Sequence, residues 1–214
     1  NDVFVVLDSA QYIKALKQSV DGRQEKHKSY QSDSPIYADA GAIFLTVPTK
    51  KGGYQPLRET QIQYDNKWQH KHIKALQNAY AKTPGSNRWL PEITDLIMHR
   101  YSSLAELNLA TIMWGIARVL GDTRPVGDLS LEYINSLLSS RQDITLNQIV
   151  LDSETGVVRP LGRQKGTEWT SALCLHVGAD EYMYGGTAQA GYMDLDYYRQ
   201  QGIEPVLQKW KLKP

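Results

Sequence analysis

Residues 66–84, NKWQHKHIKALQNAYAKTP, carry the feature that most constrains how this chain folds. At about 100° per residue, their apolar side chains fall on one continuous arc of a helix. The arc contains Ala75, Trp68, Ala79, His72, Leu76, Tyr80 and Ile73. The other side carries His70, Lys71, Lys74 and Asn78, and Gln69 alone interrupts the pattern. The spacing therefore predicts an amphipathic helix with His72 facing inward and His70 facing water.

The ends of this helix are also marked in the sequence. Asn66 is a candidate N-cap residue, with Gln69 three positions later. Thr83, Pro84 and Gly85 end the segment, because proline and glycine do not continue a helix.

The inward imidazole of His72 has two interpretations. It is either a core histidine with hydrogen-bonded nitrogens, or a partly desolvated acid or base at the edge of a cleft. The residues alone leave both interpretations open.

Length and composition limit the class of protein. The 214 residues suffice for one substantial core and would be cramped as two full domains. Lysine and arginine number 24 against 23 acidic residues, so nucleic acid is not expected as the main partner. The single Cys174 excludes an intramolecular disulfide and fits a cytoplasmic protein. No apolar run approaches the roughly 18 residues that span a bilayer, so no membrane partner is expected.

Periodicity and turn signals predict a single α/β domain with a mostly parallel sheet, flanking helices and a helical middle segment. The expected strands are 2–7, 42–47, 60–64, 148–151, 181–184 and 203–208. The expected helices lie within 66–84, 90–101, 103–120, 128–138, 167–177 and 194–201. From residue 148 on, the order is βαβαβ, which is typical of parallel strands.

Two features interrupt this plan. Residues 15–40 are polar, with turn signals at Asp21-Gly22 and Asp33-Ser34-Pro35, and predict an irregular surface insertion. The chain also starts without methionine almost inside its first strand, so we expect the natural protein to have further residues before it.

Asp8 directly follows the first expected strand, and ligands of open α/β sheets bind at the carboxyl ends of strands. Asp8, Gln11 and Lys14 are spaced to present an acid, an amide and an amine together. An N-cap for a helix starting near Ser9 explains the same residues, so both alternatives stay open.

Two loops are candidates for binding an anion. Gly185-Gly186 follows a strand and offers backbone N–H groups, although a simple turn with positive φ is the more ordinary explanation. Arg163 and Lys165 precede an expected helix start, where an anion is favoured, but an ordinary solvated loop is the alternative.

Neither the cysteine nor the histidines indicate a metal or a nucleophile. Cys174 lies between Leu173 and Leu175 in an expected helix, which is typical of a buried structural thiol. His176 shares a face with apolar residues and is expected to pack. His70 and His72 project about 160° apart and cannot bind one ion together. With no zinc, P-loop or dinucleotide motif, we expect neither metal nor cofactor.

Four segments, in this order and spacing, resemble the WbqC-like protein family. They are DVFVVLDSAQYIK, FLTVP, KWQHKHIKALQNAYAKTP and KGTEWTSALCLHVGADEYMYGGTAQAGYMDLDYYRQQGIEPVLQ. The matching residues are Asp8, Gln11, Tyr12, Lys14, Thr46, Pro48, Trp68, Lys71, His72, Tyr80, Lys165, Gly166, Gly178, Ala179, Tyr182, Gly185, Tyr192, Asp194, Gly202 and Ile203. The resemblance departs in two places: the family's opening strand with its His/Met-Gln-Pro motif is absent, and residues 15–40 replace an Asn-Arg-Asn stretch.

The resemblance implies a cytoplasmic protein of bacterial surface-polysaccharide or O-antigen biosynthesis that handles a nucleotide-activated amino sugar or a related metabolite. Some members of the family are described as glycine or aminoacyl transferases. A noncatalytic ligand-binding or partner protein that keeps the pocket is the alternative.

Together, the residues and the resemblance give a hypothesis for the site. His72, Asp8 and Lys14 are the candidate catalytic residues. The candidate substrate-binding residues are Gln11, Thr46, Lys71, Tyr80, Lys165, Tyr182, Gly185 and Gly186. In this hypothesis His72 removes a proton from an attacking amine while Lys165 and the glycine loop hold an anionic donor or sugar nucleotide.

Overall fold

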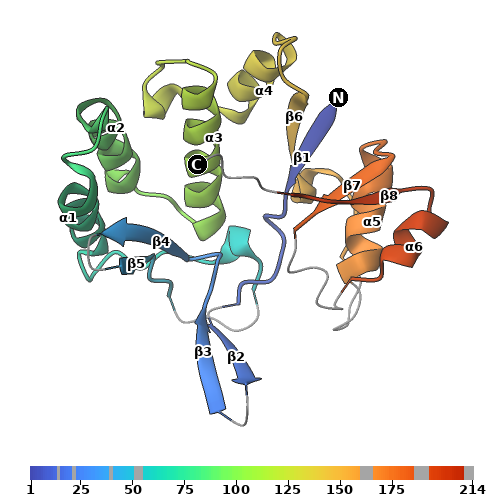
Figure 1. Ribbon diagram of the computed structural model, residues 1–214, viewed down its shortest axis with the longest axis horizontal. Helices are drawn as coiled ribbons and strands as arrows, with labels where there is room; N and C mark the ends of the chain where they lie inside the picture. Colours follow the sequence, from blue (N-terminus) through green and yellow to red (C-terminus); the bar gives the residue numbers. More distant parts are fainter. Residues whose placement is uncertain are drawn as a thin grey trace. The chain divides into compact units, whose positions relative to one another are not determined.

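The computed structural model describes residues 1–13, 15–20, 23–38, 41–50, 55–159, 166–185 and 193–209 (Figure 1). The chain divides into two compact units, one formed by Asn1–Leu7 with Leu138–Pro214 and the other by Asp8–Leu137. We call them the terminal unit and the central unit and describe each by itself. A single domain for the whole chain stays a prediction.

The central unit combines two antiparallel hairpins with helices. Its elements are β2 (Ala15–Val20), β3 (Arg23–Lys28), β4 (Asp33–Ala38), β5 (Gly41–Thr46), η1 (Leu57–Glu59), α1 (Trp68–Tyr80), α2 (Ser86–Met98), α3 (Leu104–Val119), η2 (Val126–Asp128) and the start of α4 (Leu131–Ser139). β2 pairs with β3, and β4 pairs with β5 (Figure 1).

Two predictions for this unit are wrong. Residues 15–40 are not irregular in their described part, because they supply β2, β3 and β4; antiparallel pairing satisfies the backbone of a polar strand without a continuous apolar pattern. Residues 60–64 form no strand and pair only through an isolated bridge between Thr49 and Ile62. Ile62 is buried in the core, so its apolar character reflects packing and not a strand.

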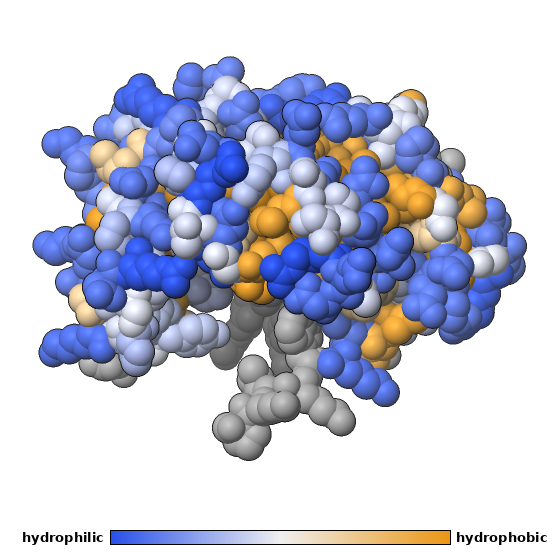
Figure 2. All heavy atoms as spheres, turned by 90° about the horizontal axis from the view of Figure 1, so that it is seen from above, coloured by the Kyte–Doolittle hydropathy of each residue, from blue (hydrophilic) through white to orange (hydrophobic). Residues whose placement is uncertain are grey.

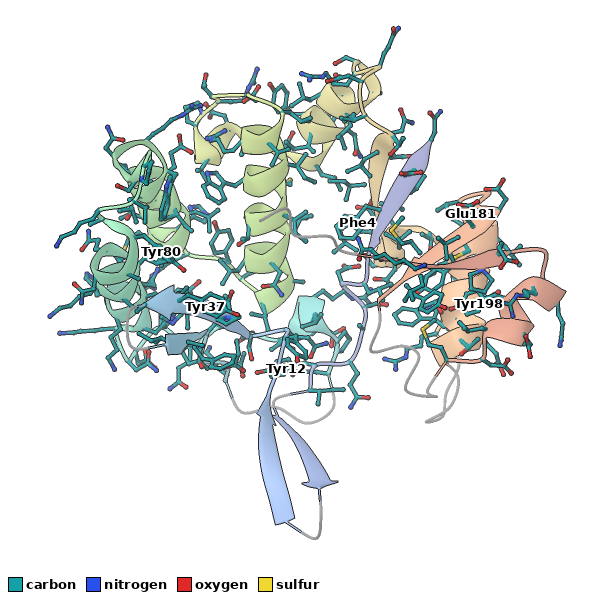
Figure 3. All side chains as sticks on the ribbon, in the orientation of Figure 1. Phe4, Tyr12, Tyr37, Tyr80, Glu181 and Tyr198 are labelled. Carbon is teal, nitrogen blue, oxygen red and sulfur yellow. The ribbon has the colours of Figure 1, made fainter. Side chains whose placement is uncertain are left out.

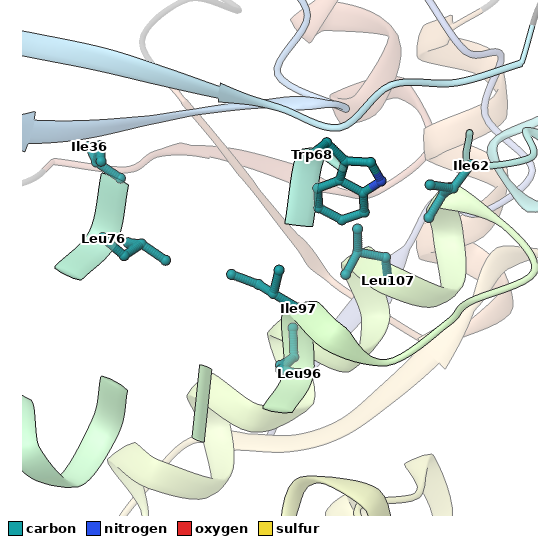
Figure 4. Packing of buried hydrophobic residues seen from close by; sticks show 7 residues of the cluster. All are labelled: Ile36, Ile62, Trp68, Leu76, Leu96, Ile97 and Leu107. Carbon is teal, nitrogen blue, oxygen red and sulfur yellow. The ribbon is translucent and has the colours of Figure 1, made fainter. Parts of the chain in front are cut away.

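The predicted arc of α1 is confirmed. The cluster that it packs into contains Ile36, Ile62, Trp68, Leu76, Leu96, Ile97 and Leu107 (Figure 4). His72 is buried and His70 is exposed. Gln69, the exception in the pattern, is buried because its amide donates to the carbonyls of Ile97 and His99 at 2.7 and 3.4 Å. It thereby satisfies backbone acceptors at the end of α2.

Side-chain contacts mark the starts of two helices, and the predicted N-cap of α1 is shifted by one residue. Lys67, in the left-handed region at φ 55°, is the N-cap of α1, and Asn66 accepts from the Trp68 N–H at 3.2 Å from one position earlier. Ser103 caps α3 by accepting from the Glu106 N–H at 3.2 Å. The Glu106 carboxylate in turn accepts from the Ser102 N–H at 2.7 Å.

The terminal unit contains two parallel strand pairs. Its elements are β1 (Asp2–Val6), β6 (Leu146–Leu151), η3 (Asp152–Glu154), α5 (Gly166–His176), β7 (Glu181–Tyr184), α6 (Leu195–Gln200) and β8 (Glu204–Leu207), together with the end of α4. β1 pairs with β6, and β7 pairs with β8 across α6, which confirms a βαβ unit. In the described part of the chain β6 pairs with β1 and not with β7, so the predicted βαβαβ succession is broken after β6.

The fold is mixed α/β, as predicted, but not mostly parallel. The described strands form two parallel and two antiparallel pairs. The reason is the N-terminal hairpins, whose polar strands gave no period-two signal. Among the described residues, no helix is long and apolar enough to cross a membrane. Hydrophilic residues cover most of the face seen in Figure 2, with hydrophobic residues gathered between them.

Candidate functional site

A buried carboxylate, Asp33, organises a group of hydroxyl side chains at the open end of the β4–β5 hairpin. Asp33 begins β4 and pairs with Thr46, which ends β5. The Thr46 hydroxyl donates to one carboxylate oxygen of Asp33. The Ser29 N–H and the Ser32 hydroxyl donate to the other oxygen at 3.0 and 3.4 Å.

Tyr12 extends this network from a distant segment of the chain. Its hydroxyl donates to the Ser32 hydroxyl at 3.1 Å and accepts from the Thr49 hydroxyl at 3.4 Å. Tyr12, which is labelled in Figure 3, is held in place by its backbone N–H, which donates to the carbonyl of Gln55 at 2.9 Å. We call Tyr12, Ser29, Ser32, Asp33, Thr46 and Thr49 the Asp33 cluster.

The polar turn between β3 and β4 is fixed to the segment that carries Tyr12. The Gln31 side chain accepts from the Ile13 N–H at 2.8 Å and donates to the Gln11 carbonyl at 3.1 Å. Asn108 of α3 donates to the Gln31 carbonyl at 3.0 Å. The predicted binding residue Gln11 therefore supports the cluster through its backbone.

Burial makes the Asp33 cluster rigid on one side and open on the other. Ser29, Ser32, Asp33 and Thr49 are buried, whereas Thr46 is exposed. Buried polar groups that satisfy one another hold a single geometry. Because the hydrogen of the Thr46 hydroxyl is committed to Asp33, the oxygen presents lone pairs and can accept from an outside donor.

His72 connects to this cluster through the backbone of Thr46. Its Nε2 lies 3.1 Å from the Thr46 carbonyl oxygen. A carbonyl can only accept, so Nε2 carries the hydrogen and the neutral ring has its lone pair on Nδ1. The ring also packs edge-on against Trp68, with centroids 4.9 Å apart.

The environment of His72 favours the neutral imidazole. Burial lowers the pKa of the ring from its usual 6.5, and the hydrogen bond to Thr46 opposes this in part. The side chain is only 8% exposed. The packing and the hydrogen bond of His72 agree with a core histidine. The same hydrogen bond fixes the ring with its lone pair on Nδ1, which a positioned base also requires, so a catalytic role stays a prediction.

Asp8 is placed by backbone contacts and not by a helix cap. Residues 8–10 form a turn, so the predicted alternative of a helix starting near Ser9 is wrong. The Asp8 carbonyl accepts from the Arg58 N–H, and the Ala10 carbonyl accepts from the Leu57 N–H, both at 2.9 Å. These bonds hold the turn against η1. The Asp8 side chain is buried.

The two other predicted residues of α1 lie in different surroundings. Lys71 is exposed. Tyr80 lies two turns beyond His72, where its hydroxyl accepts from the Tyr37 N–H at 2.9 Å (Figure 3). Its ring packs edge-on against Trp89, with centroids 5.8 Å apart. Tyr80 thus secures the tip of the β4–β5 hairpin to α1.

Comparison with models of known protein families identifies the family of this chain. The model of the WbqC-like protein family matches residues 1–214. The chain belongs to the WbqC-like protein family. The match confirms the resemblance seen in the four sequence segments. No curated protein and no solved structure matches the chain significantly.

In the terminal unit of this WbqC-like protein, Tyr182 stacks on Tyr198 with ring centroids 4.8 Å apart. Gly185 directly follows β7, and its backbone is not in the left-handed region, so the alternative of a positive-φ turn does not hold at that residue. Lys14, Arg163, Lys165 and Gly186 lie outside the described residues. A cleft shared by His72, Lys165 and the glycine loop stays a prediction.

The burial of Cys174 and His176 tests the predictions made for these two residues. Cys174 is buried, and desolvation raises the pKa of its thiol to about 11, as suits a structural cysteine. His176 is exposed, so the prediction that it packs is wrong; it is the last residue of α5, where the helix face leaves the core. Among the described residues, no three His, Cys, Asp or Glu side chains are grouped to hold a metal ion.

Sequence reasoning missed the centre of the site. Asp33 was assigned to a turn, and Ser29, Ser32 and Thr49 carried no motif of their own. Recognising residues 33–38 as a strand would have paired Asp33 with Thr46 by register alone. Tyr12 entered only through the family resemblance.

Proposed function

We propose that this WbqC-like protein is a cytoplasmic group transferase of bacterial surface-polysaccharide biosynthesis. It transfers a glycyl, aminoacyl or other acyl group to the amino group of a nucleotide-activated amino sugar or a related small metabolite. Family membership supports the substrate class. The observation that carries the mechanism is that Thr46 orients His72 through its backbone carbonyl and is itself bound to the buried Asp33 through its hydroxyl.

In the proposed reaction the amine nitrogen of the acceptor attacks the carbonyl carbon of an activated acyl ester or thioester. A new C–N bond forms, and the bond from that carbon to the leaving group breaks with its electron pair. The amine loses a proton to Nδ1 of His72, whose lowered pKa keeps the ring neutral and ready to accept it. The hydroxyl oxygen of Thr46 accepts a second hydrogen of the amine and so orients the amine.

A single substitution separates the catalytic role from packing. In His72→Gln the side-chain amide can still donate to the Thr46 carbonyl, but it cannot accept a proton at neutral pH. We expect the unfolding midpoint to stay close to that of the unmodified protein and kcat to fall about 10²–10⁴-fold, as for loss of a general base. Acyl transfer to UDP-linked amino sugars is measured by mass spectrometry. His70→Ala, on the exposed side of the same helix, is the matched control and should keep full activity.

Thermal-shift screening of sugar nucleotides and of aminoacyl or acyl donors first reduces the number of candidate substrates. A ligand present at 100 times its Kd stabilises the folded state by about 2.7 kcal/mol. Absence of any shift across the panel would contradict the substrate class. Normal turnover by His72→Gln would remove His72 from the mechanism.

The packing of His72 supports a second candidate, a noncatalytic protein that binds the same class of ligand. His72 is 8% exposed and its ring lies against Trp68, so Nδ1 has limited access to a substrate. This candidate predicts sugar-nucleotide binding without transfer from any donor. It also predicts that His72→Gln leaves the Kd unchanged, whereas Asp33→Asn weakens binding by loosening the Thr46 hydroxyl.

A further inference from the structure

The outer face of the β4–β5 hairpin carries exposed aromatic side chains next to the Asp33 cluster. Directly paired residues of an antiparallel hairpin lie on the same face. The pairs Asp33–Thr46, Pro35–Phe44 and Tyr37–Ala42 therefore share one face. Phe44 is 43% exposed and Tyr37 is 68% exposed.

The opposite face of the same hairpin contributes two residues to the core, while Ile43 on that face is exposed. Ile36 is buried in the cluster around Trp68, and Leu45 packs against that cluster. The strand pairing thus places Tyr37 and Phe44 on the outer side, and both are exposed (Tyr37 is labelled in Figure 3). The outer face is continuous with Thr46, since Phe44 and Thr46 are neighbours on one side of β5.

The spacing of Phe44 and Thr46 along β5 suits one small sugar ring. Residues two apart in a strand are separated by roughly 6.5 Å. A six-membered sugar ring that covers the side chain of Phe44 therefore reaches the Thr46 hydroxyl with its rim substituents. The open lone pairs of Thr46, polarised by Asp33, select a hydrogen-bond donor such as an amine or a hydroxyl.

We propose that this face is the acceptor subsite, and that Phe44, flanked by Tyr37, stacks on the pyranose ring of an amino sugar. This inference rests on the proposed function, because it names the binding residues for that acceptor. A pyranose combines an apolar face of C–H groups with a polar rim, which matches an aromatic surface beside a hydrogen-bond acceptor. A purely apolar partner would cover Thr46 without offering it a donor.

The test compares two adjacent residues of equal exposure on opposite faces. Phe44 and Ile43 are both 43% exposed, but only Phe44 lies on the outer face. We would measure the Kd of UDP-glucosamine, UDP-glucose and UDP by calorimetry for Phe44→Leu, Phe44→Tyr and Ile43→Ala. Loss of the aromatic contact in Phe44→Leu should raise the Kd of both sugar nucleotides about tenfold. Ile43→Ala should bind as the unmodified protein does, and Phe44→Tyr, which keeps an aromatic ring, should lose less affinity than Phe44→Leu.

Two further measurements locate the sugar. Saturation-transfer NMR should show the strongest signals on the pyranose ring protons and not on the uracil protons. Asp33→Asn should reduce the preference for UDP-glucosamine over UDP-glucose, because the oxygen of Thr46 loses its charged partner. Unfolding midpoints recorded alongside identify any variant that fails to fold.

Several results would overturn the inference: an unchanged Kd in Phe44→Leu, an equal loss in Ile43→Ala, an equal loss for UDP alone, or no binding of any probe. An equal loss for UDP would assign the aromatic face to the nucleobase. The proposed transfer is judged separately by turnover. Phe44-dependent binding without turnover refutes the transfer alone, whereas turnover with an unchanged KM in Phe44→Leu refutes the subsite alone.

Discussion

Replacing His72 by alanine tests the packing of α1 most directly. The substitution removes the edge-on contact with Trp68, worth about 0.5–1.5 kcal/mol. It also leaves the Thr46 carbonyl without its donor, at about 1–3 kcal/mol for a buried acceptor. Because Thr46 is itself exposed and its carbonyl can reach water, we take the lower part of that range. The expected loss of unfolding free energy is about 2–3 kcal/mol.

For a chain of this size, that loss lowers the midpoint of thermal unfolding by about 5–10 °C. Circular dichroism in a temperature ramp measures it, with urea unfolding as an independent check. His70→Ala should change the free energy of unfolding by less than about 0.5 kcal/mol, because His70 is exposed on the same helix. Equal midpoints for His72→Ala and His70→Ala would show that the ring is neither packed nor hydrogen-bonded as described.

Three further results are expected. The pKa of His72 is lowered on folding, so its contribution to stability is complete above pH 6.5, its ordinary value, and declines as the pH falls below it. Unfolding midpoints measured over about two pH units on either side of that value should respond less in His72→Gln. Cys174, with its pKa raised to about 11, should react with Ellman's reagent only slowly until denaturant is added, and rapid labelling of the folded protein would contradict its burial. Ser103→Ala should lower the free energy of unfolding by about 1 kcal/mol through loss of the α3 cap, whereas Ser102→Ala keeps its backbone bond to Glu106 and should change little, as urea titration would show.

The helices were predictable because their signals are local. In α1 the buried and exposed positions repeat with the helical period, so seven inward residues and His70 could be placed without knowing what they contact. The caps at Ser103 and Asp194 depend on residues within one turn. The βαβ unit of β7, α6 and β8 was visible for the same reason, since Gly178 and Gly202 mark the helix ends with positive φ.

The Asp33 cluster was not predictable because its contacts join distant positions. Asp33 and Thr46 are separated by 13 residues, and Tyr12 and Ser32 by 20. Single serines, threonines and tyrosines occur throughout any polar segment and have no distinguishing spacing. Their meaning appears only when the hairpin register and the fold of residues 8–13 against Gln31 are known.

The Asp33 cluster lies at an antiparallel hairpin and not at the end of a parallel strand, and strand direction explains the difference. In a parallel sheet the carboxyl ends of strands share one edge, and this rule directed attention to Asp8. In a hairpin, the start of one strand faces the end of the next, so Asp33 and Thr46 meet by pairing alone. A slip of one residue in either strand would turn its side chains to the other face and separate the carboxylate from the hydroxyl. Ile36 and Leu45 prevent that slip, because it would expose the apolar residues that pack around Trp68. The apolar core of the central unit therefore determines the geometry of the candidate site.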